Sequence, residues 1–108
     1  MFIRIFVEAI DKEAALKHSK EFENVISNSV VDLKKTKIEQ YWKMPEQYCV
    51  EFEFKYVMQE RMKEAIKKLG NNPDVITNKG KVEEYIFAKT TGEIYLDKIE
   101  WILINVGI

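Results

Sequence analysis

The sequence contains few of the residues from which reactive or cofactor sites are built. Its 108 residues include one cysteine, one histidine, four glycines and two prolines. A single thiol, Cys49, cannot form an intramolecular disulfide. It also cannot supply the roughly four thiolates of an iron–sulfur cluster, or the Cys-x-x-Cys pair of a metal carrier. We therefore expect neither a metal nor a cofactor.

An excess of one charge and a long apolar segment are also lacking. The 17 basic and 18 acidic residues give a formal charge of -1, so nothing attracts the chain to nucleic acid or to anionic lipid. The apolar run Trp101 to Ile104 is far shorter than the ~20 residues that span a bilayer. The N-terminus has no basic start or long apolar core, so it does not resemble a secretory signal. We expect a cytoplasmic protein with no nucleic-acid partner and no membrane partner.

What the chain does contain is typical of one globular domain. Hydrophobic residues make up 46% of the sequence and charged residues 32%, which is enough apolar material for a core. The length falls within the usual range of a single domain, so residues 1–108 are expected to form one unit without an internal linker.

The spacing of apolar residues changes along the chain and predicts the order of elements. Alternation indicates strands at 2–8, 34–43, 48–56 and 99–106, and helical spacing indicates helices at about 11–29 and 58–69. Residues 82–88 are assigned to a further strand after a turn at 78–80, and 94–96 to a short extended piece. This order predicts an α+β, ferredoxin-like βαββαβ sandwich: an antiparallel sheet with two helices on one face and an extra C-terminal strand.

Alternation within the strands assigns residues to the two faces of that sheet. The face under the helices is expected to receive Ile3, Ile5, Val7, Ile38, Trp42, Val50, Phe52 and Phe54, and Met58 and Met62 are expected to belong to the core. The open face is expected to carry Arg4, Phe6, Lys37, Glu39, Tyr41, Lys43, Cys49, Glu51, Glu53 and Lys55. This composition predicts an open face that is mixed in sign and poor in apolar area.

No cluster of residues indicates catalysis or RNA binding. RNA-recognition motifs need aromatic side chains on the open face of the middle strands, where this chain has Glu51 and Glu53. Those two carboxylates, with Glu39, could in principle act as acid and base, but cross-strand ion pairs with Arg4 and Lys37 are favoured. We expect no enzymatic activity.

Three stretches carry a resemblance to a known group of proteins: Tyr41-Trp42-Lys43-Met44-Pro45-Glu46-Gln47-Tyr48, Glu84-Tyr85-Ile86-Phe87 and Lys98-Ile99-Glu100-Trp101. They resemble small immunity proteins of bacterial polymorphic or contact-dependent toxin systems. The resemblance implies a cytoplasmic, non-catalytic protein that binds and blocks one cognate toxin domain. It supplies no site motif, so the candidate partner-binding residues come from the alternation: Lys37, Glu39, Tyr41, Lys43, Glu46, Glu51, Glu53 and Lys55.

An alternative function stays open, in which a dimer of this domain acts as a small-molecule sensor or enzyme. The last strand is apolar on both faces, which is typical of a covered or dimer-forming position. The aromatic residues that could line a pocket in that case are Phe6, Trp42, Phe54, Tyr85 and Trp101.

Overall fold

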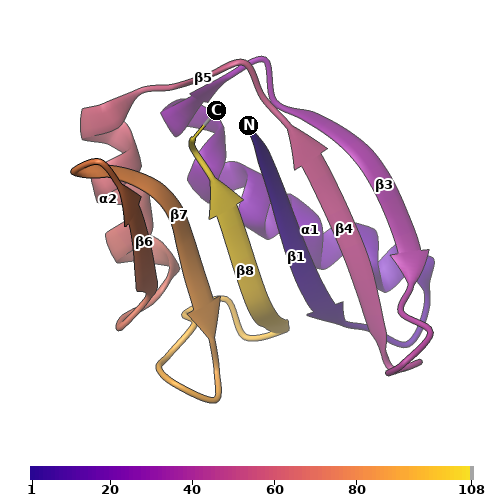
Figure 1. Ribbon diagram of the computed structural model, residues 1–108. Helices are drawn as coiled ribbons and strands as arrows, with labels where there is room; N and C mark the ends of the chain where they lie inside the picture. Colours follow the sequence, from indigo (N-terminus) through magenta and orange to yellow (C-terminus); the bar gives the residue numbers. More distant parts are fainter. Residues whose placement is uncertain (108) are drawn as a thin grey trace.

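The computed structural model describes residues 1–107, and it has an α+β architecture with a six-stranded antiparallel sheet, a small two-stranded sheet and two α-helices (Figure 1). The elements are β1 (Phe2–Glu8), α1 (Lys12–Ile26), the 3-10 turn η1 (Ser27–Ser29), β2 (Val30–Val31), β3 (Lys34–Gln40), β4 (Gln47–Glu53), β5 (Tyr56–Val57), α2 (Gln59–Leu69), β6 (Asp74–Asn78), β7 (Lys81–Ala88) and β8 (Ile99–Asn105). Six strands form the sheet, in the order β3-β4-β1-β8-β7-β6, and β2 pairs separately with β5.

The first and last strands of the described chain are neighbours at the centre of the sheet. Ile3 of β1 lies opposite Ile104 of β8, and on its other side opposite Phe52 of β4. From α2 the chain runs to β6 at the far edge and returns through β7 to β8 (Figure 1). The strands beyond the predicted βαββαβ order, β6 and β7, therefore come before the last strand, β8. This corrects the prediction of an extra C-terminal strand.

The hairpin β6–β7 forms where the sequence predicted a turn and a strand. Lys79 and Gly80 have φ angles of 54° and 80°, and they separate the paired residues Asn78 and Lys81. Two successive positive φ angles match the right-handed twist of a two-residue hairpin. The turn at 78–80 and the strand at 82–88 are confirmed.

Both helices begin and end near their predicted limits. The Asp11 carboxylate accepts a hydrogen bond of 2.8 Å from the Ala14 amide, which satisfies one free N–H group at the start of α1. α1 ends at Ile26, and the 3-10 turn completes the predicted range. α2 ends at Leu69, and the next residue, Gly70, approaches another segment closely. A Cβ atom at Gly70 would lie 2.1 Å from the carbonyl oxygen of Glu93. The extended piece expected at 94–96 is reduced to an isolated β-bridge between Ile94 and Gly70.

The core lies between the sheet and the helices. Ile5 and Ile102 are adjacent across the central strands and are fully buried, as are Phe22 of α1 and Phe52 of β4. Burial of each large apolar side chain stabilises the fold by about 1.5–3 kcal/mol. The inward residues of β1 and β4 are as predicted.

Two residues predicted for the core lie outside it. Trp42 is 79% exposed, because β3 ends at Gln40 and the chain enters a turn before the alternation reaches the indole. Met58 is 39% exposed, because it precedes the first residue of α2 and does not share the helix's inward stripe.

Candidate functional site: the open face of the sheet

The face of the sheet away from the helices is built from three rows of side chains that run across the strands. The register gives these rows as Lys37–Glu51–Arg4–Leu103–Ile86–Asp74, Glu39–Cys49–Phe6–Trp101–Ala88 and Lys34–Glu53–Phe2–Asn105–Glu84–Ile76. Each row alternates with an inward row, as the pleat of a sheet requires. In the first two rows, charged residues occupy the β3 side and apolar residues the β8 and β7 side.

The charged half of this face is held together by ion pairs. Arg4 Nε lies 2.8 Å from Glu51 Oε1, and Lys37 Nζ lies 2.9 Å from Glu39 Oε1. The hydrogen bond and negative charge of Glu39, with a smaller contribution from Glu51, raise the pKa of Lys37 above its ordinary value. These charges are positioned by neighbours on the same face and form an ordered pattern.

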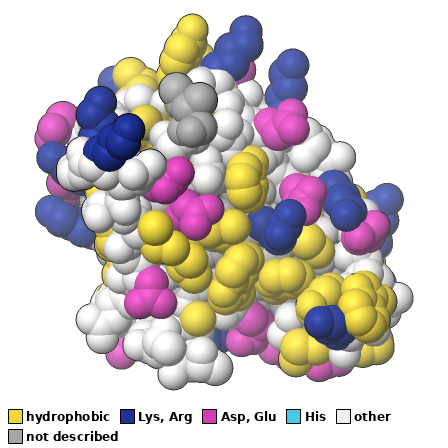
Figure 2. Space-filling view, viewed as in Figure 1, with side chains coloured by type: hydrophobic (Ala, Val, Ile, Leu, Met, Phe, Trp, Pro, Cys, Tyr) yellow, Lys and Arg dark blue, Asp and Glu magenta, His cyan; other side chains and the backbone are white. Residues whose placement is uncertain are grey.

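The apolar half is centred on an aromatic contact between the two central strands. The Phe6 ring lies 5.3 Å from the Trp101 ring and 4.8 Å from the Tyr41 ring, measured between centroids. Leu103 and Ile86 continue this surface across β8 and β7. Figure 2 shows hydrophobic side chains gathered across the lower middle of the face, with acidic and basic side chains mixed toward β3 and β4. We call Phe6, Tyr41, Ile86, Trp101 and Leu103 the aromatic strip.

The aromatic strip corrects the prediction that the open face is poor in apolar area. That prediction counted the outward residues of the strands now labelled β1, β3 and β4. It left out Trp101 and Leu103, because the last strand was expected to be covered on both faces. The structure places β8 beside β1 with its inner side under the helices and its outer side among neighbouring side chains, where Leu103 is 9% exposed and Trp101 is partly exposed. The signal was present in the sequence as apolar residues at alternate positions 101 and 103.

The turn between β3 and β4 adds an exposed aromatic ring beside this strip. The Trp42 ring lies 6.3 Å from Tyr41, and the Lys43 ammonium lies 5.0 Å from the Trp42 ring centroid. The turn is anchored because the Gln40 side-chain amide donates to the Pro45 carbonyl at 2.7 Å and the Ala9 amide donates to the Glu46 carbonyl at 3.0 Å. It therefore presents Trp42 on an ordered loop.

The structure brings most of the candidate partner-binding residues together. Four of them share the open face: Lys37, Glu39, Glu51 and Glu53. The Tyr41 ring contacts the Phe6 ring, while Lys43 and Glu46 lie in the adjoining turn. Lys55 lies beyond the end of β4, and its ammonium pairs with Asp32 at 3.2 Å. The alternation therefore named the charged residues of this face and Tyr41, and it did not place Trp101, Leu103 or Ile86 on it.

The environment of Cys49 does not favour nucleophilic chemistry. Its side chain is 7% exposed and lies in the register between Phe6 and Glu39. Burial, followed by the negative charge of Glu51, raises the pKa of the Cys49 thiol, so the thiolate that would react is disfavoured. Residues 1–107 also contain no group of three or more His, Cys, Asp or Glu side chains arranged to hold a metal ion.

The aromatic residues expected to line a pocket have separate environments. Phe6 and Trp101 lie on the open face, Trp42 is exposed in the turn, Phe54 is buried and Tyr85 packs against the core. They do not surround a common cavity.

Comparison with models of protein families, with curated proteins and with solved structures finds no match. Neither helix in the described part of the chain has the length and apolar character needed to cross a bilayer.

Proposed function

We propose that this chain is a non-catalytic protein-binding module that docks its partner on the open face of the sheet. The partner is a bacterial toxin domain, which the chain neutralises in the cytoplasm as immunity proteins do. The observation that carries the proposal is the aromatic strip, an apolar surface on an unpartnered sheet face with ordered ion pairs along one side. The resemblance of residues 41–48, 84–87 and 98–101 to immunity proteins supports the choice of partner.

The composition of the face is suited to protein recognition. Interfaces concentrate affinity in a few central Trp, Tyr and Arg side chains and surround them with a polar rim. Trp101 and Arg4 lie on the two central strands and Tyr41 contacts Phe6 from the end of the edge strand β3, while Lys37 and Glu39 belong to the rim. Six strands of about seven residues present roughly 600 Å² of flat area, and the Trp42 turn extends it toward the ~800 Å² per partner of a standard interface.

The same proposal includes a ferredoxin-like arrangement for the central part of the domain. Strands β3, β4, β1 and β8 with α1 and α2 follow the order expected for a split βαβ sandwich. The hairpin β6–β7 then widens the sheet beside β8. This widening supports docking, since it adds Ile86 to the aromatic strip.

The test begins with the gene beside the one that encodes this chain. If that neighbour encodes a large secreted protein with a variable C-terminal domain, that domain is titrated with this chain by calorimetry. We expect tight binding, and we expect Trp101→Ala to weaken it by about 30-fold or more, the loss typical of a central interface residue. Tyr56→Ala is the matched control, because Tyr56 is exposed on β5, outside the six-stranded sheet.

Three outcomes contradict the proposal. The first is the absence of any binding by the neighbouring domain. The second is an equal loss of binding for Trp101→Ala and Tyr56→Ala. The third is a stable homodimer of the free protein, measured by sedimentation and lost in Trp101→Ala, because a second copy of the chain would then be the natural occupant of the face.

A further inference from the structure

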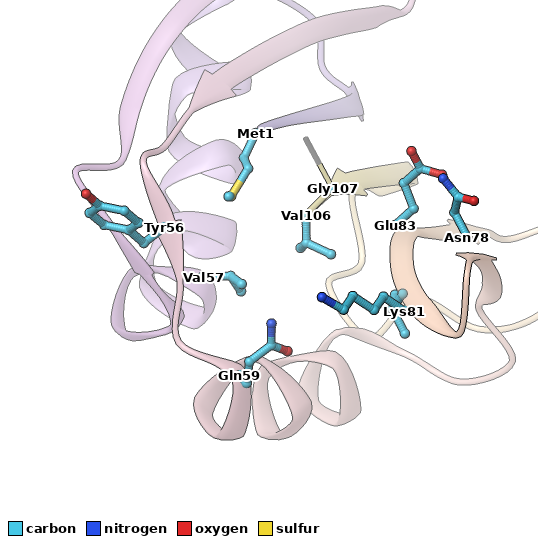
Figure 3. Close-up of a pocket in the computed structure, with 10 residues that line it drawn as sticks. Met1, Tyr56, Val57, Gln59, Asn78, Lys81, Glu83, Val106 and Gly107 are labelled. Atoms are coloured by element: carbon cyan, nitrogen blue, oxygen red, sulfur yellow. The ribbon is translucent and has the colours of Figure 1, made fainter.

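A cavity of about 660 Å³ lies at one end of the molecule, away from the aromatic strip (Figure 3). Segments that are distant in the sequence form its walls: the start of β1, β5 with the first residue of α2, the tip of the β6–β7 hairpin, and the residues that follow β8. Pockets that hold small ligands in proteins have volumes of about 300–1,000 Å³. This cavity has the size of a small-molecule site.

We propose that this cavity binds a small carboxylic acid with an apolar chain or ring, and that Lys81 holds its carboxylate. The site is independent of the proposed docking face. It concerns a small ligand of this chain and not the protein partner proposed above.

The walls provide an apolar environment for the body of such a ligand. Met1, Val57, Val82 and Val106 all line the cavity, and each comes from a different strand or strand end. In Figure 3 the side chains of Met1, Val57 and Val106 extend toward the same central space. A chain or ring of carbon atoms placed there would exclude water from all of these side chains.

The polar groups of the cavity gather on one side of it. The Lys81 ammonium, from the start of β7, and the Gln59 side-chain amide, from the start of α2, extend toward each other in the lower part of the space (Figure 3). Among the described residues, Lys81 belongs to no ion pair within 4.0 Å, whereas Lys63 and Lys67 on α2 pair with Glu60 and Glu64. A carboxylate accepts hydrogen bonds from both an ammonium and an amide N–H, so it fits this side of the cavity.

The one carboxylate among the lining residues is directed elsewhere. Glu83 lies beside Asn78, and its side chain points away from Lys81 (Figure 3). Its backbone carbonyl accepts hydrogen bonds from the amides of Val106 and Gly107 at 2.9 and 3.1 Å, which fixes the edge of the cavity. Among the described residues that line the cavity, the charge directed into it is the positive charge of Lys81, and this selects an anion.

The experiment uses octanoate as the probe, with octylamine and octan-1-ol as ligands of equal chain length and different head groups. Each is titrated into the 15N-labelled full chain by NMR, and heats are measured by calorimetry. We expect octanoate to shift the amides of Val57, Lys81 and Val106. We expect Lys81→Gln to weaken octanoate binding about tenfold or more, as for loss of a charged hydrogen bond. Lys20→Gln, the same change of charge on the exposed surface of α1, leaves binding unchanged.

The tryptophans distinguish this site from the docking face. Trp42 and Trp101 both lie outside the cavity, so binding inside it leaves tryptophan emission unchanged. The proposal is overturned if millimolar octanoate shifts none of the three amides, if octylamine binds as well as octanoate, or if Lys81→Gln and Lys20→Gln bind alike. Shifts confined to Phe6 and Trp101 also overturn it, and they leave the docking proposal standing.

Discussion

The two halves of the open face share one sheet and one alternation of side chains, yet they differ in chemistry. On the β3 and β4 half, outward side chains such as Glu51 are charged and already paired within the protein. On the β8 and β7 half, Trp101 and Ile86 are partly exposed beside Leu103, which is 9% exposed, and no helix lies over them. Charged borders mainly set the rate and specificity of association, whereas desolvated aromatic centres mainly set affinity. The comparison assigns different tasks to the two halves.

The largest expected effect concerns Ile102, whose side chain points into the core on the side of β8 opposite to the aromatic strip. Ile102 follows Trp101 in β8, is fully buried and lies between Ile5 and Phe87. We expect Ile102→Ala to lower the free energy of unfolding by about 2–5 kcal/mol, because it leaves a cavity in the core. Ile10→Ala at a position that is 96% exposed is the matched control, with an expected change within about 0.5 kcal/mol. Urea denaturation measures both, and equal effects would show that β8 has the opposite orientation.

The apolar half is tested by the coupling between its two central rings. In a double-mutant cycle with Phe6→Ala and Trp101→Ala, we expect an interaction free energy of about 0.5–1.5 kcal/mol, the range for aromatic pairs in contact. The cycle is measured by urea denaturation of the four proteins. Additive effects would mean that the rings do not touch in solution.

The charged half should give a smaller and salt-sensitive coupling. The Arg4 and Glu51 side chains are 42% and 25% exposed, so solvent screens their attraction. We expect a cycle with Arg4→Gln and Glu51→Gln to give about 0.2–1 kcal/mol. The coupling should fall in about 1 M salt, where the Debye length is near 3 Å. A coupling larger than that of Phe6 and Trp101, and unchanged by salt, would reverse the comparison between the halves.

The smallest effect concerns Cys49, where the two halves meet. Burial raises the pKa of this thiol in the folded protein, so the unfolded chain loses its thiol proton first as the pH rises. The stabilising contribution is therefore complete below the pKa of the unfolded thiol and is lost as the pH rises through the folded pKa. Alkylation by iodoacetamide at about pH 8 should be slower in native protein than in urea-unfolded protein. Equal rates would show that the thiol is accessible and ordinary.

Local alternation made the strands beside the turn at 44–46 predictable. Tyr48 to Glu53 contains charged or small residues at outward positions and apolar residues at inward ones, so a shift of one residue would bury Glu51. The same pattern correctly placed Ile3, Ile5 and Val7 under the helices. Where one face is polar and the other apolar, the sequence is sufficient to assign both.

The place of Trp101 and Leu103 on the open face, the exposure of Trp42 and the cavity were not predicted, each for a different reason. Residues 101–104 are apolar at successive positions, and such a strand does not tell which of its faces a helix covers. Trp42 continued the alternation of β3, but the hydrogen bond between the Tyr41 amide and the Gln47 carbonyl already belongs to the turn. The cavity joins Met1, Val57, Lys81 and Val106, whose proximity depends on the complete tertiary fold.

The adjacency of β1 and β8 also determines when this molecule acquires its shape. The hairpins β3–β4 and β6–β7 connect residues that are near one another in sequence, so they close short loops. The pairing of β1 with β8 closes a loop that contains nearly all of the described chain. Of these pairings, it therefore requires the greatest loss of chain entropy. During translation, Ile3 and Ile5 therefore stay without their β8 neighbours until the last strand emerges from the ribosome.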